Sequence, residues 1–206
     1  MATVNMFGTG HQKLEWAVSS FPLAGERESG DLYFVQEFNN GALVAVVDGL
    51  GHGSEAAYAS QRAASVLAKH AGETVISLVR ICHAELQSTR GVVMSLASFN
   101  FIDESMTWLS IGNVEAILYR ADLSVQPATE QVFQRGGVIG YQLPQLRATV
   151  LPIAHGDTVI LATDGIKPDF ADGLKFRDSP QRIADEIGKK YRKENDDSLV
   201  LVVRYL

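Results

Sequence analysis

The sequence contains a single cysteine, Cys82, among its 206 residues. One thiol cannot form an internal disulfide, so the fold has to be held together by its packed core. Cys82 also falls within an apolar stripe at helical spacing, which indicates a packing role rather than a reactive nucleophile.

Long hydrophobic runs and an excess of positive charge are also missing. No apolar run approaches the roughly 20 residues that span a bilayer, and Met1 to Lys13 lacks the basic-then-apolar pattern of a signal peptide. Eighteen Lys and Arg residues face 24 Asp and Glu residues, which gives a formal net charge of -6. Non-specific nucleic-acid binding requires a basic face. We therefore expect a cytoplasmic protein that binds neither nucleic acid nor membrane.

The patterning predicts one domain over residues 1–206, since no repeat, low-complexity stretch or long linker interrupts it. Two early helices inserted among many short strands indicate an α+β fold in which helices cover largely antiparallel sheet. The strands are expected at 14–18, 32–38, 42–47, 92–101, 106–111, 115–119, 148–151, 158–163 and 199–203, and the helices at 54–70, at 75–86 and from Pro180 onward.

Acidic residues stand where the expected core strands begin or end. Four such acids can converge on one rim of a sheet packing. The segments concerned are Ala42 to Val47 followed by Asp48-Gly49, Thr158 to Thr163 followed by Asp164-Gly165, Asp196-Asp197 before Leu199 to Val203, and Asp31 at the start of a strand.

An Asp-Gly pair after a strand is, taken alone, most simply a turn. Two such pairs after six-residue apolar runs, with a third acidic pair before another run, favour a site instead. Converging carboxylates repel one another unless a cation compensates, and carboxylate oxygens suit hard cations such as Mg²⁺ and Mn²⁺. Two such ions can clamp a phosphate for in-line attack, and Gly49 would allow the backbone to approach one of them closely.

These motifs resemble the signature of the metal-dependent serine/threonine phosphatases of type 2C, and in particular the bacterial SpoIIE branch. The likeness covers nearly the whole chain in the right order, without an added sensor domain. The motifs that carry it are Gly30-Asp31, Asp48-Gly49-Leu50-Gly51-His52-Gly53, Arg90-Gly91, Ser110 to Val114, Gly140-Tyr141, Thr163-Asp164-Gly165 and Asp196-Asp197.

The resemblance implies a four-layer αββα sandwich with two central, mostly antiparallel sheets and a centre of probably two Mn²⁺ or Mg²⁺ ions. Asp48 would bridge both ions, and the remaining metal ligands would be the Gly49 carbonyl, Asp31, Asp164 and Asp196. The nucleophile would be metal-activated water. The small stand-alone members of the branch imply a substrate among phosphorylated STAS-domain proteins of a stressosome-like complex.

The sequence departs from the family pattern in three places. Leu50 stands where the larger eukaryotic branch has a proposed acid histidine, and His52 either donates a proton or shapes the loop. At the last motif the ligand is Asp196, or Asn195 if the alignment is shifted by one residue. Arg27 resembles a phosphate-binding arginine of distant relatives, and a surface role is the alternative.

Two further functions stay open at this point. The chain could be a non-catalytic module that docks on STAS proteins, or a phosphoesterase for small molecules with the same centre. The segment 166–177, which follows the Asp164 motif, is expected to form a mobile flap over the site.

Overall fold

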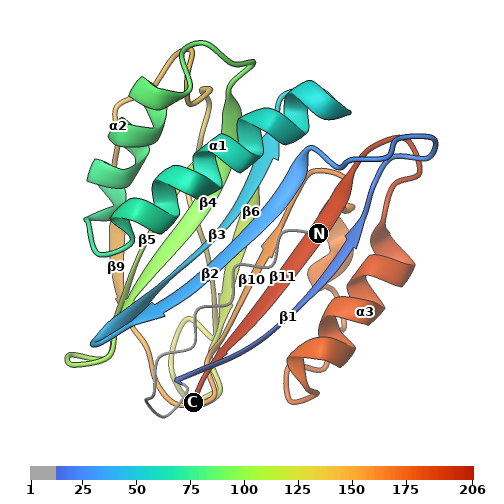
Figure 1. The fold of residues 1–206 in the computed structure, drawn as a ribbon. Helices are drawn as coiled ribbons and strands as arrows, with labels where there is room; N and C mark the ends of the chain where they lie inside the picture. The colour runs from blue at the N-terminus through green and yellow to red at the C-terminus, as the bar shows by residue number, and fades with distance from the viewer. Residues whose placement is uncertain (1–12) are drawn as a thin grey trace.

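The computed structural model describes residues 13–206 and shows two β-sheets packed face to face, with helices on both outer surfaces (Figure 1). Residues 1–12, which the signal-peptide prediction concerned, lie outside the described part. Sheet A has the strand order β1 (Leu14–Phe21), β11 (Ser198–Tyr205), β10 (Thr158–Ala162), β6 (Glu115–Tyr119) and β7 (Thr129–Gln131). Sheet B has the order β2 (Asp31–Phe38), β3 (Gly41–Gly49), β4 (Val92–Asn100), β5 (Ser105–Ile111) and β8 (Gln134–Arg135), and β9 (Thr149–Pro152) also pairs with β5.

The helices form the two outer layers. The helices α1 (Ser54–His70) and α2 (Val75–Glu85) cover sheet B, and α3 (Pro180–Tyr191) covers sheet A. The strand pairs are antiparallel except for the short parallel pair of β5 with β8. The predicted αββα sandwich is therefore confirmed, and only the short edge strands β7 and β8 and the 3-10 turn η1 (Pro168–Ala171) were not predicted.

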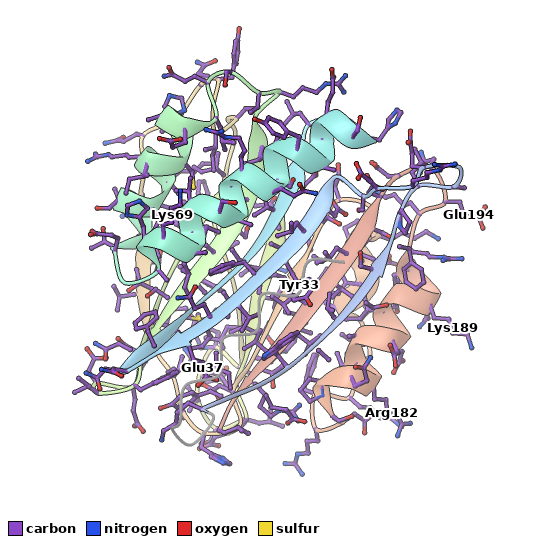
Figure 2. All side chains as sticks on the ribbon, in the orientation of Figure 1. Tyr33, Glu37, Lys69, Arg182, Lys189 and Glu194 are labelled. Atoms are coloured by element: carbon purple, nitrogen blue, oxygen red, sulfur yellow. The ribbon has the colours of Figure 1, made fainter. Side chains whose placement is uncertain are left out.

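The hydrophobic core has three layers because the central strands are buried on both faces. In β3, Val44 and Val46 point into the space between the sheets, whereas Leu43, Ala45 and Val47 pack under α1 and α2. A continuous apolar run, rather than an alternating one, is typical of such a doubly covered strand. The exposed side of α3 is charged instead, and Lys189 projects outward there (Figure 2).

Local sequence explains where the elements begin and turn. The Ser179 hydroxyl accepts a hydrogen bond from the Arg182 N–H at 3.4 Å, and Pro180 occupies the first turn of α3, so the predicted cap is confirmed. The two-residue turn at Asn39-Asn40 joins β2 to β3, with Phe38 directly opposite Gly41.

Cys82 lies fully buried on the inner side of α2. Burial, followed by the charge of Glu85, raises the pKa of the thiol to about 12. The thiol therefore stays protonated at neutral pH, as expected for a packing residue. Within residues 13–206 no helix has both the length and the apolar character needed to cross a membrane.

The segment 166–177 differs from its expected form. Phe170 is 1% exposed and Leu174 is 8% exposed, and both belong to the core between sheet A and α3. Lys167 also donates its N–H to the Tyr191 carbonyl at 2.9 Å. Apolar side chains at η1 and beyond thus fasten the segment to the outer face of sheet A, and the prediction of a flap over the site was wrong in its location.

Candidate metal centre

The register of sheet B places two of the predicted ligands opposite each other. Asp31 begins β2 and Asp48 lies near the end of β3, and the antiparallel pairing aligns these two residues directly. Their carboxylates therefore share one end of the sheet, drawn uppermost in Figure 1. Asp31 is only 8% exposed, and its Oδ2 accepts a hydrogen bond of 2.8 Å from the Thr163 hydroxyl.

Thr163 connects this pair to sheet A. Its Oγ1 accepts the Leu199 N–H at 2.9 Å while donating to Asp31, so one hydroxyl bridges β2 to the ends of β10 and β11. Asp164 follows immediately. Its Oδ2 accepts a 2.7 Å hydrogen bond from the Asn113 amide, and its main-chain carbonyl accepts one from the Lys193 ammonium at 2.5 Å. The four acids predicted from the strand ends are thus gathered at one rim, called the acid rim below: Asp31, Asp48, Asp164 and Asp196.

The electrostatics of the acid rim show strong mutual repulsion. Burial and then the charge of Asp48 raise the pKa of Asp31 well above its ordinary value. Burial, followed by the charges of Asp164, Asp196 and Asp197, raises the pKa of Asp48 to about 7. Burial and then Asp164 raise the pKa of Asp196. Each shift reports a carboxylate that would be stabilised by a nearby cation.

The donor set fits a hard divalent cation. The predicted ligands offer carboxylate and carbonyl oxygens, which suit Mg²⁺ and Mn²⁺ better than Zn²⁺ or Cu²⁺. Across residues 13–206, no group of three or more His, Cys, Asp or Glu side chains is placed closely enough to hold a metal ion as the side chains stand. Mg²⁺ keeps several waters and uses one or two carboxylates per ion, so an open set of acids is compatible with it. The residues that would hold the ions are Asp31, Asp48, Gly49, Asp164 and Asp196.

The glycines of the two Asp-Gly pairs are explained by close packing. A Cβ on Gly49 would lie 2.2 Å from the Ala56 carbonyl oxygen of α1, and one on Gly165 would lie 1.8 Å from the Asp197 carbonyl oxygen. Neither glycine has a positive φ. Each small residue thus lets another backbone segment approach the rim. Asp48-Gly49 belongs to β3, whereas Asp164-Gly165 does form a turn, closed by the Ile166 N–H donating to the Thr163 carbonyl at 3.0 Å.

Two alternatives from the sequence can be compared with the structure. Asn195 is exposed, whereas Asp196 is half-buried beside Asp164. Both carboxylate oxygens of the neighbouring Asp197 already accept hydrogen bonds, from the Leu23 N–H at 2.7 Å and from the Gly30 N–H at 2.8 Å. These placements favour Asp196 as the ligand from the last motif.

His52 and Arg27 lie at the edge of the acid rim. The His52 Nδ1 is 2.8 Å from the Glu26 Oε1, and the side chain is 60% exposed. This contact joins the loop before α1 to the loop before β2, as the loop-shaping alternative predicted. Arg27 is exposed, and no hydrogen bond or ion pair holds it among residues 13–206. A catalytic role for His52 and a phosphate-binding role for Arg27 stay predictions.

Asp197 was quoted in the sequence motif without a role of its own, and the structure provides one. It is 3% exposed and holds the loop before β2 from a position 174 residues further along the chain. Thr163 and Asn113 were likewise part of quoted motifs but were not identified as supports of the acids. For Thr163 the available signal was its place directly before Asp164, whereas Asn113 lies 51 residues from Asp164 in a motif without an acid.

We expect Asp197→Ala to destabilise the fold by about 2–4 kcal/mol, because two backbone N–H groups would lose their acceptor. Chemical denaturation in metal-free buffer measures this. Asp185→Ala, which removes an exposed carboxylate of α3 bonded to Gln181, serves as the matched control and should change stability by less than about 0.5 kcal/mol. Equal stability of the two variants would show that Asp197 does not hold the loop before β2.

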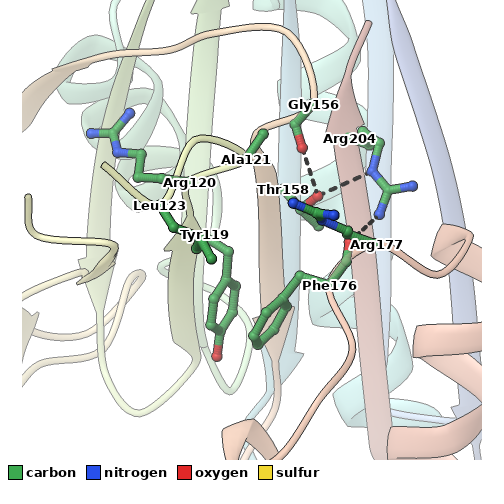
Figure 3. Close-up of a pocket in the computed structure, with 9 residues that line it drawn as sticks. All are labelled: Tyr119, Arg120, Ala121, Leu123, Gly156, Thr158, Phe176, Arg177 and Arg204. Atoms are coloured by element: carbon green, nitrogen blue, oxygen red, sulfur yellow. Dashed lines mark hydrogen bonds between the residues drawn. The ribbon is translucent and has the colours of Figure 1, made fainter. Parts of the chain in front are cut away.

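One hollow among the described residues lies away from the acid rim. It has a volume of about 400 Å³ and lies beside Tyr119, Thr158 and Phe176 (Figure 3). Thr158 begins β10 and Asp164 follows its other end, so the hollow lies at the opposite end of sheet A. Arg204 donates to the carbonyls of Phe176 at 2.6 Å and Asp178 at 2.7 Å there. Arg204 therefore holds the 166–178 segment against sheet A and does not belong to the candidate metal centre.

Comparison with known proteins agrees with this architecture. The family model of Stage II sporulation protein E (SpoIIE) matches residues 39–206. Phosphoserine phosphatase RsbX of Bacillus subtilis (strain 168) is 27% identical over 185 residues, covering 88% of this chain and 89% of that protein.

Solved structures show the same fold. The structure of RsbX in complex with magnesium has a TM-score of 0.84 at 23% identity and covers 96% of this chain and 98% of that one. A chain from a study of the bacterial stressosome has a TM-score of 0.84 at 26% identity, with 94% and 100% covered. The PP2C phosphatase domain of SpoIIE from Bacillus subtilis has a TM-score of 0.77 at 21% identity, with 94% and 62% covered.

The chain belongs to the SpoIIE family, whose model covers more than half of it. Together with the likeness to RsbX, this makes it a protein serine/threonine phosphatase of the PP2C type. The family predicted from the ordered motifs is therefore confirmed.

Proposed function

We propose that this phosphatase removes phosphate from phosphoserine or phosphothreonine of a STAS-domain protein in a stressosome-like complex. The observation that carries the catalytic part is the acid rim, where Asp31, Asp48, Asp164 and Asp196 meet and where burial and neighbouring charges raise the pKa of Asp31, Asp48 and Asp196. The likeness to RsbX and to a chain from a study of the stressosome supports the substrate class.

The residues of the rim have separate tasks in this proposal. Mn²⁺ or Mg²⁺, as two ions, would supply a water that is nucleophilic at neutral pH and would offset the charge of the phosphate. Asp48, placed between Asp31 and the acids of sheet A, would touch both ions. Asp31 and Asp164 are oriented by Thr163 and Asn113, respectively. Preoriented ligands favour catalysis because they need no rearrangement as the charge develops.

The proton and phosphate would be handled by groups at the edge of the rim. His52, whose Nδ1 lies 2.8 Å from the Glu26 Oε1, would donate a proton to the leaving serine oxygen. Arg27 carries a free guanidinium on the loop before β2 and can approach an incoming phosphate. Both tasks are secondary to the rim.

The substrate is tested by incubating a serine-phosphorylated STAS-domain protein with the phosphatase and Mn²⁺ or Mg²⁺, and following the phosphoprotein on phosphate-affinity gels. We expect complete loss of the phosphorylated band with either or both metals and none in EDTA. Persistence of the band with several STAS proteins and both metals would reject the substrate class. Tight binding to the STAS protein without turnover would favour a docking module, and faster turnover of free phosphoserine or nucleotides would favour a small-molecule phosphoesterase.

A further inference from the structure

A second hollow lies at the edge of sheet B that β8 and β9 form. It has a volume of about 270 Å³, and its lining includes Phe133, Arg135 and Arg147. Phe133 is 73% exposed, and the Arg135 guanidinium carbon lies 5.1 Å from the centre of its ring. An exposed aromatic ring under a guanidinium is a surface that can take both apolar and anionic groups.

The two arginines of the hollow have no anionic partner. Among residues 13–206, no carboxylate lies within ion-pair distance of Arg135 or Arg147, and no hydrogen bond of either guanidinium is present. Each guanidinium has five N–H donors arranged to bind a carboxylate. On a chain with a formal net charge of -6, this hollow is a local positive site on the same sheet as Asp31 and Asp48.

The sheet register connects the hollow to the acid rim. Val47, Met94, Ile111 and Arg135 form one row of paired residues across β3, β4, β5 and β8. Val47 immediately precedes Asp48, so Arg135 stands three strand spacings away, or about 14 Å. Beyond it, the Gly112 N–H donates to the Arg135 carbonyl at 2.7 Å, and the next residue, Asn113, holds Asp164.

We propose that this hollow is the docking site for an acidic segment of the phosphoprotein substrate, which positions the phosphoserine over the acid rim. The inference rests on the proposed function. An extended chain advances about 3.3 Å per residue, so about four residues span the 14 Å between rim and hollow. Acidic side chains four or five residues from the phosphoserine would reach Arg135 and Arg147, and Phe133 would contact the apolar part of the same segment.

Two phosphoserine peptides test the docking site. They are identical except for Asp or Lys at the fourth and fifth positions on both sides of the phosphoserine. We expect wild-type kcat/KM to be about tenfold higher for the Asp peptide, the effect of two partly exposed ion pairs. Arg135→Gln/Arg147→Gln should bring the ratio to about one, and Arg135→Glu/Arg147→Glu should reverse it.

The controls separate docking from folding and from chemistry. Each rate is divided by the same variant's rate on an aryl phosphate, which is too short to reach the hollow. Arg80→Glu makes the same two-unit change of charge as Arg135→Gln/Arg147→Gln, at an exposed position of α2, and should keep the wild-type ratio. A wild-type ratio near one, or a ratio unchanged by both double variants, would overturn the docking site.

Fluorescence anisotropy of the two labelled peptides distinguishes failure of the docking site from failure of the proposed function. An inactive wild type on every phosphate ester would reject the proposed function. The same peptides would still show docking as tighter binding of the Asp peptide that is lost in both double variants. Equal binding of the two peptides would reject docking whether or not turnover occurs.

Discussion

Asp48→Asn is expected to lower Mn²⁺-dependent hydrolysis of an aryl phosphate by about 10³-fold or more. Asn keeps the size of the side chain but removes the charge that would hold both ions, and the loss of preorganised charge at a reacting centre costs at least this much in rate. Steady-state rates with 4-nitrophenyl phosphate across a Mn²⁺ titration measure the effect. Circular dichroism checks that the variant is folded.

Asp185→Asn is the matched control for this experiment, because it makes the same chemical change on the exposed side of α3. Its rate should equal that of the wild type. If Asp48→Asn retained full activity, Asp48 would be a structural turn residue and the assignment of the centre would be wrong. If activity returned at much higher Mn²⁺, Asp48 would contribute to affinity more than to the reaction.

The metal-free wild type is expected to lose stability as the pH rises from about 4 to about 7. Burial and neighbouring carboxylates raise the pKa of Asp48 from 3.8 to about 7 in the folded protein. The folded state therefore binds a proton more tightly than the unfolded state. That stabilisation is fully present below the unfolded pKa and is lost as the pH rises through the folded value. Asp31 shifts in the same direction.

The same variant tests this linkage. Asp48→Asn cannot ionise, so in EDTA at pH 7.5 it should be more stable than the wild type, by on the order of 2–4 kcal/mol. At pH 4 the difference should largely disappear. Mn²⁺ should raise the Tm of the wild type and much less that of the variant. Urea denaturation at both pH values measures the difference, and parallel pH profiles of the two proteins would contradict the repulsive rim.

The elements of this fold were predictable because their patterns are strong. Residues 42–47 form an unbroken apolar run followed by Asp-Gly, and the structure has a strand at Gly41–Gly49 that is buried on both faces. The Ala-rich segment from Ser54 to His70 has the predicted bounds of α1. By contrast, β7 and β8 have three and two residues, and their exposed or half-exposed side chains show no periodic signal.

The acidic residues of the site could be predicted from the sequence, but the residues that hydrogen-bond to them could not. An acid at a strand end can be located from the apolar run beside it. That Thr163 would donate to Asp31, 132 residues away, depends on how the two sheets face each other, and periodicity within one strand carries no such information. The hydrogen bonds from the Leu23 and Gly30 N–H groups to the Asp197 carboxylate could not be predicted for the same reason.

The order of the strands has a consequence for biosynthesis. Sheet A begins with β1, yet β11 lies between β1 and β10 and is the last strand of the chain to be synthesised. A nascent chain that has not reached Ser198 can build sheet B, but its β1 has no partner strand to pair with. Asp196 and Asp197 directly precede β11. The last proposed metal ligand and the residue that holds the loop before β2 are therefore synthesised just before this strand. A chain that stops before Asp196 would therefore lack both the partner strand of β1 and one of the proposed metal ligands.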